Sequence, residues 1–391
     1  MQKNKSLILG ITGGIAAYKA AELVRLLIKA HIDVQVVMTE AAAKFITPMT
    51  MQALSGKPVF TGMWDSNIDN GMPHIELSRG VDAILIAPAS AEFVAKLLHG
   101  RADDLLSTLC LARDCPLLVA PAMNKQMWEN PATQRNFSQL ISDNIVVLGP
   151  GNGEQACGET GDGRMLEASE LLANVIAHFT PKILADKKVL ITAGATIEML
   201  DPVRGITNLS SGKMGYALAQ VAANMGADVT LISGISHLAK PANVNFKQAT
   251  SAEAMYNAVM QAIQNQDIFI AVAAVADYSP SETATQKIKK NAESITIPLK
   301  RNKDILADVA HLSNPPFCVG FAAESEHVIE YATQKRLSKK LPLIIANEVT
   351  STIGLDDNQV TLIDDNGHHT LTRASKSQLA HEILEHISNM L

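Results

Sequence analysis

The sequence carries one local pattern twice, once near the N-terminus and once near the middle of the chain. Residues 6–12 and 188–193 are short apolar runs, and each leads through a glycine-containing turn to an alanine-rich segment, the second after a polar loop. A strand, a glycine turn and a helix in this order are typical of a parallel sheet that binds its ligand where the strands end. We therefore predict an α/β protein with two doubly wound sheets.

The length of the chain and one short segment support this division. The chain has 391 residues, which exceeds one ordinary core and favours two domains of roughly 180–200 residues. Residues 180–188 contain the helix-breaking Pro181 and closely spaced lysines, as expected of a domain boundary. We predict Rossmann-like domains at 1–180 and 188–391, joined by a linker at 181–187.

Composition excludes several classes of function. A net charge of −6 and 4% aromatic residues argue against a general nucleic-acid binder. The N-terminal sequence does not resemble a signal peptide, and no stretch approaches the roughly 18 apolar residues that a membrane span requires. We expect a soluble, cytoplasmic protein whose four cysteines, which lack metal-binding spacing, are reduced thiols.

The first glycine turn is a candidate phosphate site. Gly13 and Gly14 open a helix that begins at Ile15, where backbone N–H groups can bind a phosphate. The sequence TGGIAA is not a G-x-G-x-x-G motif, and no acidic residue ends the next apolar run at 33–38, which disfavours a dinucleotide. A single phosphate fits better; the alternative is a plain strand-to-helix turn.

Four further residues of the first half are candidates for chemistry. Ser90 and Asn124 each follow an apolar run that ends in Ala-Pro, so both point to one sheet edge, although each alone is more often a turn or cap residue. His74 is a lone histidine, which is usually structural. Cys157 lies in the glycine-dense segment 149–165, which we predict to be a mobile flap that closes over a ligand.

These residues belong to four motifs that resemble the flavin-dependent cysteine decarboxylases, and most closely the phosphopantothenoylcysteine decarboxylase domain. The motifs are GITGGIAAYK at 10–19, His74, PAMNKQMW at 121–128 and ACGETGDGRM at 156–165. The resemblance implies a flavodoxin-like domain that binds FMN at Gly13, Gly14, Ile15, Thr39 and Ser90. It also implies that Asn124 holds the substrate, that His74 lies beside the flavin and that Cys157 sits on a clamp.

The implied chemistry suits these residue types. Flavin can oxidise a cysteinyl C–S unit to a thioaldehyde, which allows the neighbouring carboxylate to leave as CO₂. His74 would act as the base, and the Asn124 amide would orient the carboxylate by hydrogen bonding. Cys157 would supply the proton or reducing step that yields the saturated thiol.

In the second half, individual residues leave alternatives open. The sequence SSGKMG at 210–215 is not a P-loop, because it lacks the upstream glycine and has Met214 where a Ser or Thr is required. Asp277 follows a predicted strand at 267–274, and it can bind a ribose or a base or cap the next turn. The run 287–290, KIKK, is a solvated face or neutralises a triphosphate.

The second half resembles bacterial phosphopantothenate–cysteine ligase, and the whole chain resembles the bifunctional coenzyme A biosynthesis enzymes. The motifs are ITAG at 191–194, DPVRGITNLSSGKMG at 201–215, AAVAD at 273–277, KIKK at 287–290 and GFAAE at 320–324. The resemblance implies CTP with Mg²⁺, and attack by 4'-phosphopantothenate to give an acyl-cytidylate from which L-cysteine displaces CMP. The implied contacts are Asn208 to the acyl-cytidylate and, to the nucleotide, Ala271, Val272, Ala273, Asp277, Lys287, Lys303, Asp304, Ile305, Leu306, Phe321, Lys335 and Lys339.

Two other functions are weighed against this one. A flavoprotein whose first half is only a binding module is disfavoured by the presence of His74, Asn124 and Cys157. A tandem nucleotide-binding dehydrogenase is disfavoured because the ribose-binding acid is missing. By resemblance, flavin halves form trimers with shared sites and ligase halves form dimers, so we expect a homo-oligomer, up to a dodecamer.

Overall fold

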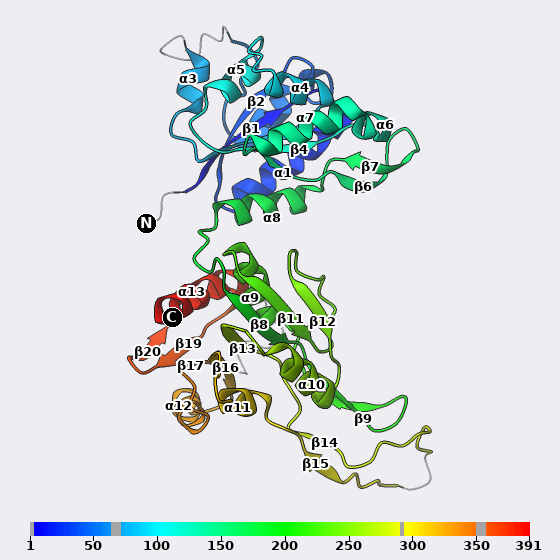
Figure 1. The fold of residues 1–391 in the computed structure, drawn as a ribbon, viewed down its shortest axis with the longest axis vertical. Coiled ribbons are helices and arrows are strands. Elements are labelled where there is room, and N and C mark those ends of the chain that lie inside the picture. Colours follow the sequence, from blue (N-terminus) through cyan, green and yellow to red (C-terminus); the bar gives the residue numbers. More distant parts are fainter. Residues whose placement is uncertain (1–3, 64–71, 290–292, 349–356) are drawn as a thin grey trace. The chain divides into compact units, whose positions relative to one another are not determined.

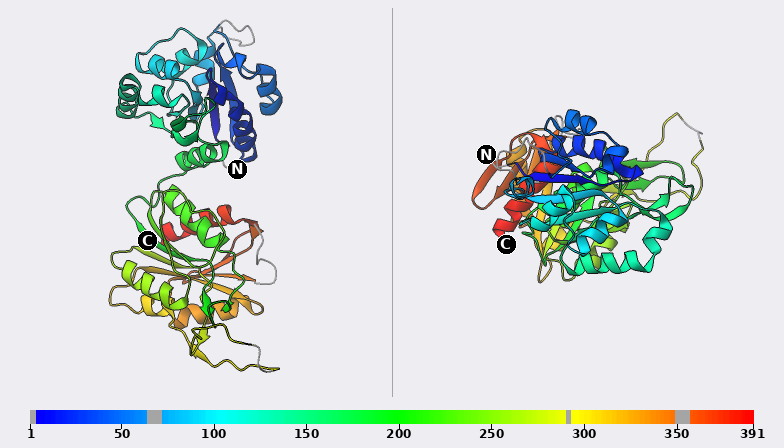
Figure 2. Two further views of the ribbon diagram at one scale, coloured as in Figure 1. Left: turned by 90° about the vertical axis from the view of Figure 1, so that its right-hand side faces the viewer. Right: turned by 90° about the horizontal axis from the view of Figure 1, so that it is seen from above.

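The computed structural model describes residues 4–63, 72–289, 293–348 and 357–391 (Figure 1). The chain forms two compact units, Met1–Phe179 and Thr180–Leu391. Each unit consists of one main sheet with helices on both faces (Figure 2). The predicted α/β, doubly wound fold class is confirmed. No helix among the described residues is both long and apolar enough to cross a membrane.

The first unit contains a five-stranded parallel sheet with strand order β2-β1-β3-β4-β5. Because the chain moves to β2 on one side of β1 and to β3 on the other, the crossover direction reverses between β1 and β3, which opens a crevice at the carboxyl ends of these strands. The strands are β1 (Ser6–Ile11), β2 (Asp33–Met38), β3 (Ala83–Ala89), β4 (Leu117–Pro121) and β5 (Val146–Val147).

Two hydrophobic cores lie on the two faces of this sheet. Along β1, Leu7 and Leu9 pack into one core and Ile8 into the other, because successive side chains of a strand point to opposite faces. The first core is completed by α1 (Tyr18–Lys29), α2 (Pro48–Ser55) and α8 (Ala168–Phe179), and the second by α4 (Ala91–Leu98), α5 (Leu105–Ala112) and α7 (Pro131–Ser142). The short helices of the unit are η1 (Ile15–Ala17), η2 (Ala42–Lys44), α3 (Pro73–Ser78) and α6 (Lys125–Glu129).

The glycine-dense segment predicted as a flap forms an antiparallel hairpin of β6 (Gly151–Glu154) and β7 (Thr160–Arg164). Gly163 connects this hairpin to the loop before α6: its carbonyl accepts a hydrogen bond of 2.9 Å from the Met123 N–H. At Gly163 the angle φ is +128°, and a Cβ atom would lie 2.5 Å from the Met123 carbonyl oxygen. Only glycine therefore allows this close approach of the two backbones.

The second unit is built on an eight-stranded sheet with order β12-β11-β8-β13-β16-β17-β19-β20. The first six strands are parallel, whereas β19 and β20 form an antiparallel hairpin at one edge. The crossover direction reverses between β8 and β13, which defines a second crevice. The strands are β8 (Lys188–Ala193), β11 (Asp228–Ser233), β12 (Asn245–Gln248), β13 (Ile268–Ala271), β16 (Phe317–Glu324), β17 (Leu343–Glu348), β19 (Thr361–Asp364) and β20 (Gly367–Thr370).

Helices cover both faces of the second sheet as well. One face packs against α9 (Lys213–Asn224) and α13 (Lys376–Met390), and the other against α10 (Ala252–Ala262), α11 (Ile305–Ala310) and α12 (Val328–Ser338). Leu184, in the segment predicted as a linker, is buried in the first of these cores. Three short antiparallel pairs complete the unit: β9 (Ile197–Met199) with β10 (Gly205–Thr207), β14 (Tyr278–Pro280) with β15 (Leu299–Arg301), and β18 (Asp357–Asn358) with β21 (Ala374–Ser375).

Candidate active sites

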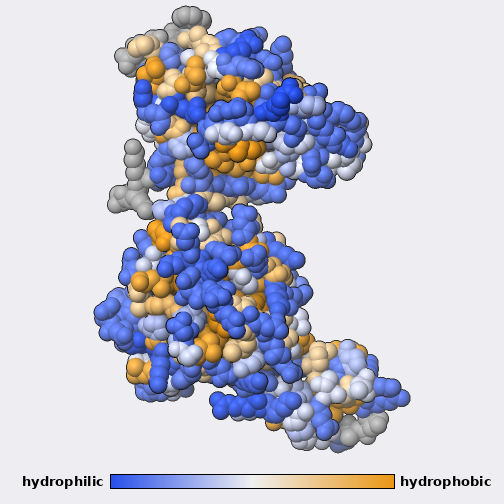
Figure 3. All heavy atoms as spheres, viewed as in Figure 1, coloured by the Kyte–Doolittle hydropathy of each residue, from blue (hydrophilic) through white to orange (hydrophobic). Residues whose placement is uncertain are grey.

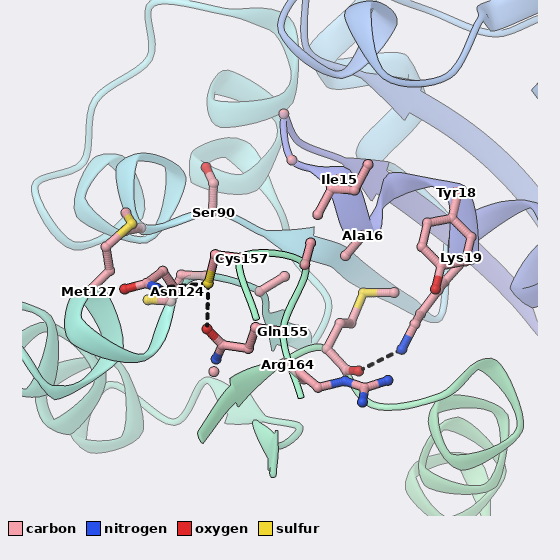
Figure 4. Close-up of a pocket in the computed structure, with 18 of the residues that line it drawn as sticks. Ile15, Ala16, Tyr18, Lys19, Ser90, Asn124, Met127, Gln155, Cys157 and Arg164 are labelled. Carbon is pink, nitrogen blue, oxygen red and sulfur yellow. Dashed lines mark hydrogen bonds between the residues drawn. The ribbon is translucent and has the colours of Figure 1, made fainter. Parts of the chain in front are cut away.

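A cavity of about 650 Å³ lies at the carboxyl ends of β1, β3 and β4 in the first unit. The hairpin β6–β7 contributes Cys157 and its neighbours to one wall, while the turn after β1 forms the facing wall (Figure 4). This volume lies within the usual range for small-molecule sites. Six residues predicted from the sequence line it: Gly13, Gly14, Ile15, Ser90, Asn124 and Cys157.

Local hydrogen bonds fix the floor of this cavity. The Thr12 hydroxyl donates to the Pro88 carbonyl at 2.7 Å and accepts from the Ser90 N–H at 2.9 Å, which ties the end of β1 to the end of β3. Gly13 passes so close to Ala41 that a Cβ atom would lie 2.6 Å from the Ala41 Cβ. The turn therefore holds the start of the following helix, with the N–H groups of its first turn, at the crevice.

The polar centre of the cavity joins Asn124 to the hairpin. The Asn124 side-chain amide donates to Glu159 at 2.5 Å and to the Cys157 sulfur at 3.5 Å, and its carbonyl oxygen caps α6 by accepting from the Gln126 N–H at 2.8 Å. Hydrogen bonds from Asn124 and then from Gln126 lower the pKa of Glu159. Glu159 is not among the residues predicted from the sequence, although its position two residues after Cys157 in the motif at 156–165 is a signal for it.

A buried lysine anchors the far end of the hairpin. The Lys19 ammonium donates to the Met165 carbonyl at 3.1 Å and to Glu167 at 2.6 Å, and Figure 4 shows it pointing toward the end of β7. Lys19 and Arg164 both line the cavity, and both form ion pairs with Glu167, at 2.6 Å and 3.1 Å. Lys19 is the last residue of the motif at 10–19, but the sequence alone predicts no role for it.

Two predicted residues of the first half do not line the cavity. Thr39 directly follows β2 at the same edge of the sheet, and its hydroxyl accepts a hydrogen bond of 3.2 Å from the Ala42 N–H. His74 lies on α3, which packs against α5 on one side of the sheet. The fold of a single chain therefore brings neither side chain to Cys157.

A second cavity, of about 570 Å³, lies at the carboxyl ends of β8, β13 and β16. Gly212, with φ of +79°, ends the polar loop and begins α9, so the start of this helix also faces the cavity. The Asn208 amide donates to the Ala274 carbonyl at 3.0 Å, which joins the loop to the end of β13. Six predicted residues line the cavity: Asn208, Val272, Ala273, Asp277, Phe321 and Lys335.

Lysines and a carboxylate form a charged group beside this cavity. Lys339 forms an ion pair of 2.6 Å with Asp304, whose carboxylate also caps α11 by accepting from the Ala307 N–H at 3.0 Å. Burial, and secondarily the Lys339 charge, lower the pKa of Lys335. An anionic ligand would oppose both effects by favouring the charged ammonium, so Lys335 is well placed to bind one.

The structure separates the remaining predicted residues from this cavity. Ala271 is the last residue of β13 and does not line the cavity. Ile305 and Leu306 are buried in the hydrophobic core between the sheet and α10–α12. Lys303 lines another cavity, of about 400 Å³, where its ammonium lies 4.3 Å from the centre of the Tyr256 ring.

Lys287 is exposed on the segment between β14 and β15, and the last residue of its basic run, at 290, lies outside the described residues. Asp201 holds this segment in place. Its buried carboxylate accepts from the Arg204 guanidinium at 2.5 Å and from the Ile288 N–H at 3.1 Å. The hydrogen bond from Arg204 lowers the pKa of Asp201 well below its usual range. Lys287 is therefore attached to the loop that follows β8, although it does not line the cavity.

The fold and the two sites define a two-domain α/β protein, with a thiol–amide cavity in the first unit and a lysine-bearing cavity in the second. Comparison with protein families agrees: residues 1–180 match the family described as "Flavoprotein", and residues 184–391 match "DNA/pantothenate metabolism flavoprotein C-terminal domain".

Curated relatives match nearly the whole chain. The coenzyme A biosynthesis bifunctional protein CoaBC of Vibrio cholerae is 50% identical over 99% of this chain and 98% of its own length. The proteins of the same name from Escherichia coli K12 and Bacillus subtilis are 46% and 41% identical, over 98% and 99% of this chain and 96% and 98% of their own lengths. The chain belongs to the family of bifunctional coenzyme A biosynthesis proteins, which confirms the predicted family and its combination of a decarboxylase with a ligase.

Proposed function

We propose that the second unit ligates L-cysteine to 4'-phosphopantothenate in a CTP-dependent reaction through an acyl-cytidylate, and that the first unit decarboxylates the product to 4'-phosphopantetheine with FMN. The observation that carries this proposal is the contact of Cys157 with the Asn124 amide, 3.5 Å apart, at the wall of a cavity on the β1/β3 switch point. Both family matches support it. The proposal retains the cytoplasmic location predicted from the sequence.

The residues of the first cavity fit FMN. Gly13 and Gly14 place a helix start at the crevice, which suits the phosphate, and Ser90 follows the neighbouring strand. Ile15, Tyr18 and Met127 line the cavity and are 63%, 61% and 48% exposed, so they offer apolar surface to a flat ring system. When bound, the flavin would supply the oxidation of the C–S unit.

The side chains around it orient the substrate and move protons. The Asn124 amide hydrogen-bonds the substrate carboxylate, after Glu159 has moved away from it. Cys157 lies on the hairpin and would donate the final proton, while the two electrons that give the saturated thiol would return from the reduced flavin. The hairpin would keep water from the reactive intermediate. Thr39 follows β2 at the same sheet edge, where its N–H donates to the Ile11 carbonyl at 3.0 Å, so it can contact the ligand within its own chain. His74 does not line the cavity of its own chain, so its proposed role beside the flavin would come from a neighbouring copy in a homo-oligomer.

In the second cavity, positive charge would bind the triphosphate. Lys335, assisted by Lys339 next to it, offsets repulsion between the nucleotide and the phosphopantothenate and stabilises charge on the leaving pyrophosphate. Mg²⁺ is part of the proposal for the same reason. Asp277 follows β13 and Asn208 follows β10, and both line the cavity. Asp277 would contact the nucleotide, and Asn208 would contact the acyl-cytidylate.

Mass analysis of the products tests the proposal. Protein supplied with L-cysteine, 4'-phosphopantothenate, CTP and Mg²⁺ should form 4'-phosphopantothenoylcysteine without FMN and 4'-phosphopantetheine with FMN. Failure to form the first product would refute the ligase assignment. Accumulation of the first product when FMN is present would refute the decarboxylase assignment.

A further inference from the structure

Three side chains of the second unit form a cluster outside the 570 Å³ cavity, which is called the ligase cavity below. Asp364 ends β19, His369 lies on β20 and His386 lies near the end of α13 (Figure 1). The Asp364 Oδ2 atom is 2.9 Å from His386 Nε2 and 3.4 Å from His369 Nε2. All three potential ligand atoms lie within 4.8 Å of one another.

The carboxylate at the centre of this cluster is held rigidly. Asp364 is buried, and its Oδ1 atom accepts hydrogen bonds from the backbone N–H groups of Asn366 at 2.7 Å and Gly367 at 3.1 Å. These bonds occupy one oxygen and direct the other, Oδ2, toward the two imidazoles. Backbone partners of this kind orient metal ligands in known sites.

We propose that Asp364, His369 and His386 form a binding site for a divalent transition-metal ion of the zinc class. Two imidazole nitrogens and one carboxylate oxygen are a ligand set that suits Zn²⁺, Co²⁺ and Ni²⁺. Mg²⁺ prefers oxygen ligands, so this site is distinct from any magnesium that accompanies the nucleotide.

The geometry requires one imidazole to move. The ligand atoms of a tetrahedral zinc site, with bonds of about 2.0–2.2 Å, lie roughly 3.3–3.6 Å apart. The distances from Asp364 Oδ2, 2.9 Å and 3.4 Å, are already near this spacing. The widest separation in the cluster, at most 4.8 Å, must shorten by roughly 1 Å. His369 can make this shift because its side chain is 42% exposed on a hairpin at the edge of the sheet, and this exposure leaves the remaining coordination position to water.

The ion would connect the edge of the sheet to the C-terminal helix. Asp364 and His369 belong to the β19–β20 hairpin, whereas His386 belongs to α13, and the first residue of that helix, Lys376, lines the ligase cavity. Because the ion binds only when hairpin and helix are docked, its binding stabilises the folded second unit.

Titration of the full-length protein with Zn²⁺ or Co²⁺ tests this site, after treatment with a chelator and in the presence of excess Mg²⁺. Calorimetry gives the number of ions bound, and the visible absorption of Co²⁺ reports nitrogen–oxygen coordination. His369→Asn and His386→Asn remove one ligand each. His368→Asn is the matched control, because His368 is the exposed neighbour on the same strand and points to its other face.

We expect the wild type and His368→Asn to bind one ion more per chain than either ligand variant does. Their thermal unfolding midpoint should rise with Zn²⁺ concentration, and that of the ligand variants should not. The proposal is overturned if the wild type binds no ion, or if it binds the same number of ions as both His369→Asn and His386→Asn.

Discussion

The side-chain amide of Asn124 donates a hydrogen bond of 2.5 Å to the carboxylate of Glu159, two residues beyond Cys157. In the proposed reaction the same amide holds the substrate carboxylate. Glu159 therefore occupies the position of the substrate carboxylate in the ligand-free protein, and substrate must displace it. The contact also links the hairpin that carries the thiol to the group that binds the substrate.

Glu159→Gln should lower the KM for 4'-phosphopantothenoylcysteine several-fold, because a neutral amide competes less strongly for Asn124 than a carboxylate does. Steady-state kinetics of CO₂ release separates this effect on KM from any effect on kcat. Glu154→Gln is the matched control: Glu154 lines the same cavity from β6, and its substitution should leave KM unchanged. An unchanged or increased KM for Glu159→Gln would show that Glu159 does not compete with substrate.

Gly13→Ala should destabilise the FMN-free first unit by about 1–3 kcal/mol, since the added methyl group overlaps the Ala41 Cβ atom at 2.6 Å. Gly14→Ala should be nearly neutral in the same measurement, because no atom lies within 4 Å of its added Cβ. Urea unfolding of both variants without flavin checks this difference. Equal stabilities would mean that the turn relaxes without cost.

Lys335→Gln should abolish CTP-dependent ligation while decarboxylation of supplied 4'-phosphopantothenoylcysteine continues, because the lysine lines only the second cavity. Lys340→Gln removes the same charge from an exposed position and serves as the control. Separate assays of ligation and of decarboxylation measure the two activities of each variant. Loss of both activities in Lys335→Gln would indicate that the two sites are not independent.

Asp201→Asn should loosen the segment that carries Lys287, and the effect should depend on pH. The hydrogen bond from Arg204 lowers the pKa of Asp201 in the folded state. The carboxylate therefore contributes its full stability above its unfolded pKa, about 4, and loses it as the pH falls toward the lower folded value. The stability difference between wild type and Asp201→Asn should be constant from pH 7 to pH 5 and shrink below about pH 4. Acid titration followed by circular dichroism measures it, and a difference that grows in acid would contradict the assignment.

Exposed apolar side chains bear on the expected homo-oligomer. Most of the surface in Figure 3 is hydrophilic, with smaller hydrophobic patches. Ile15 and Tyr18 beside the first cavity and Leu209, 84% exposed, beside the second remain open to solvent in a single chain. The homo-oligomer remains a prediction, and the absence of His74 from its own cavity is the reason to test it.

Much of the site follows from local sequence. The apolar runs predicted the central strands, and the first glycine turn predicted the helix start at Ile15, because strand and helix periodicity are properties of a few neighbouring residues. Ser90 and Asn124 were placed at one sheet edge by the rule that parallel strands end together. Both also cap the helices that follow them, so the structural alternative and the functional one are compatible.

Only the tertiary structure decided which of these residues meet. The strand order placed Asn124 beside Glu159 and Cys157. It placed His74 on α3, away from the first cavity, and Lys303 in a cavity separate from the one that Lys335 lines. The cluster of Asp364, His369 and His386 depends on a hairpin at the sheet edge and on a helix that follows it, and spacing along the chain gave no sign of it. The sequence by itself determined the main strands and helices and the family. The distances between side chains were decided by the pairing of distant strands and the packing of helices, because such distances depend on the whole core.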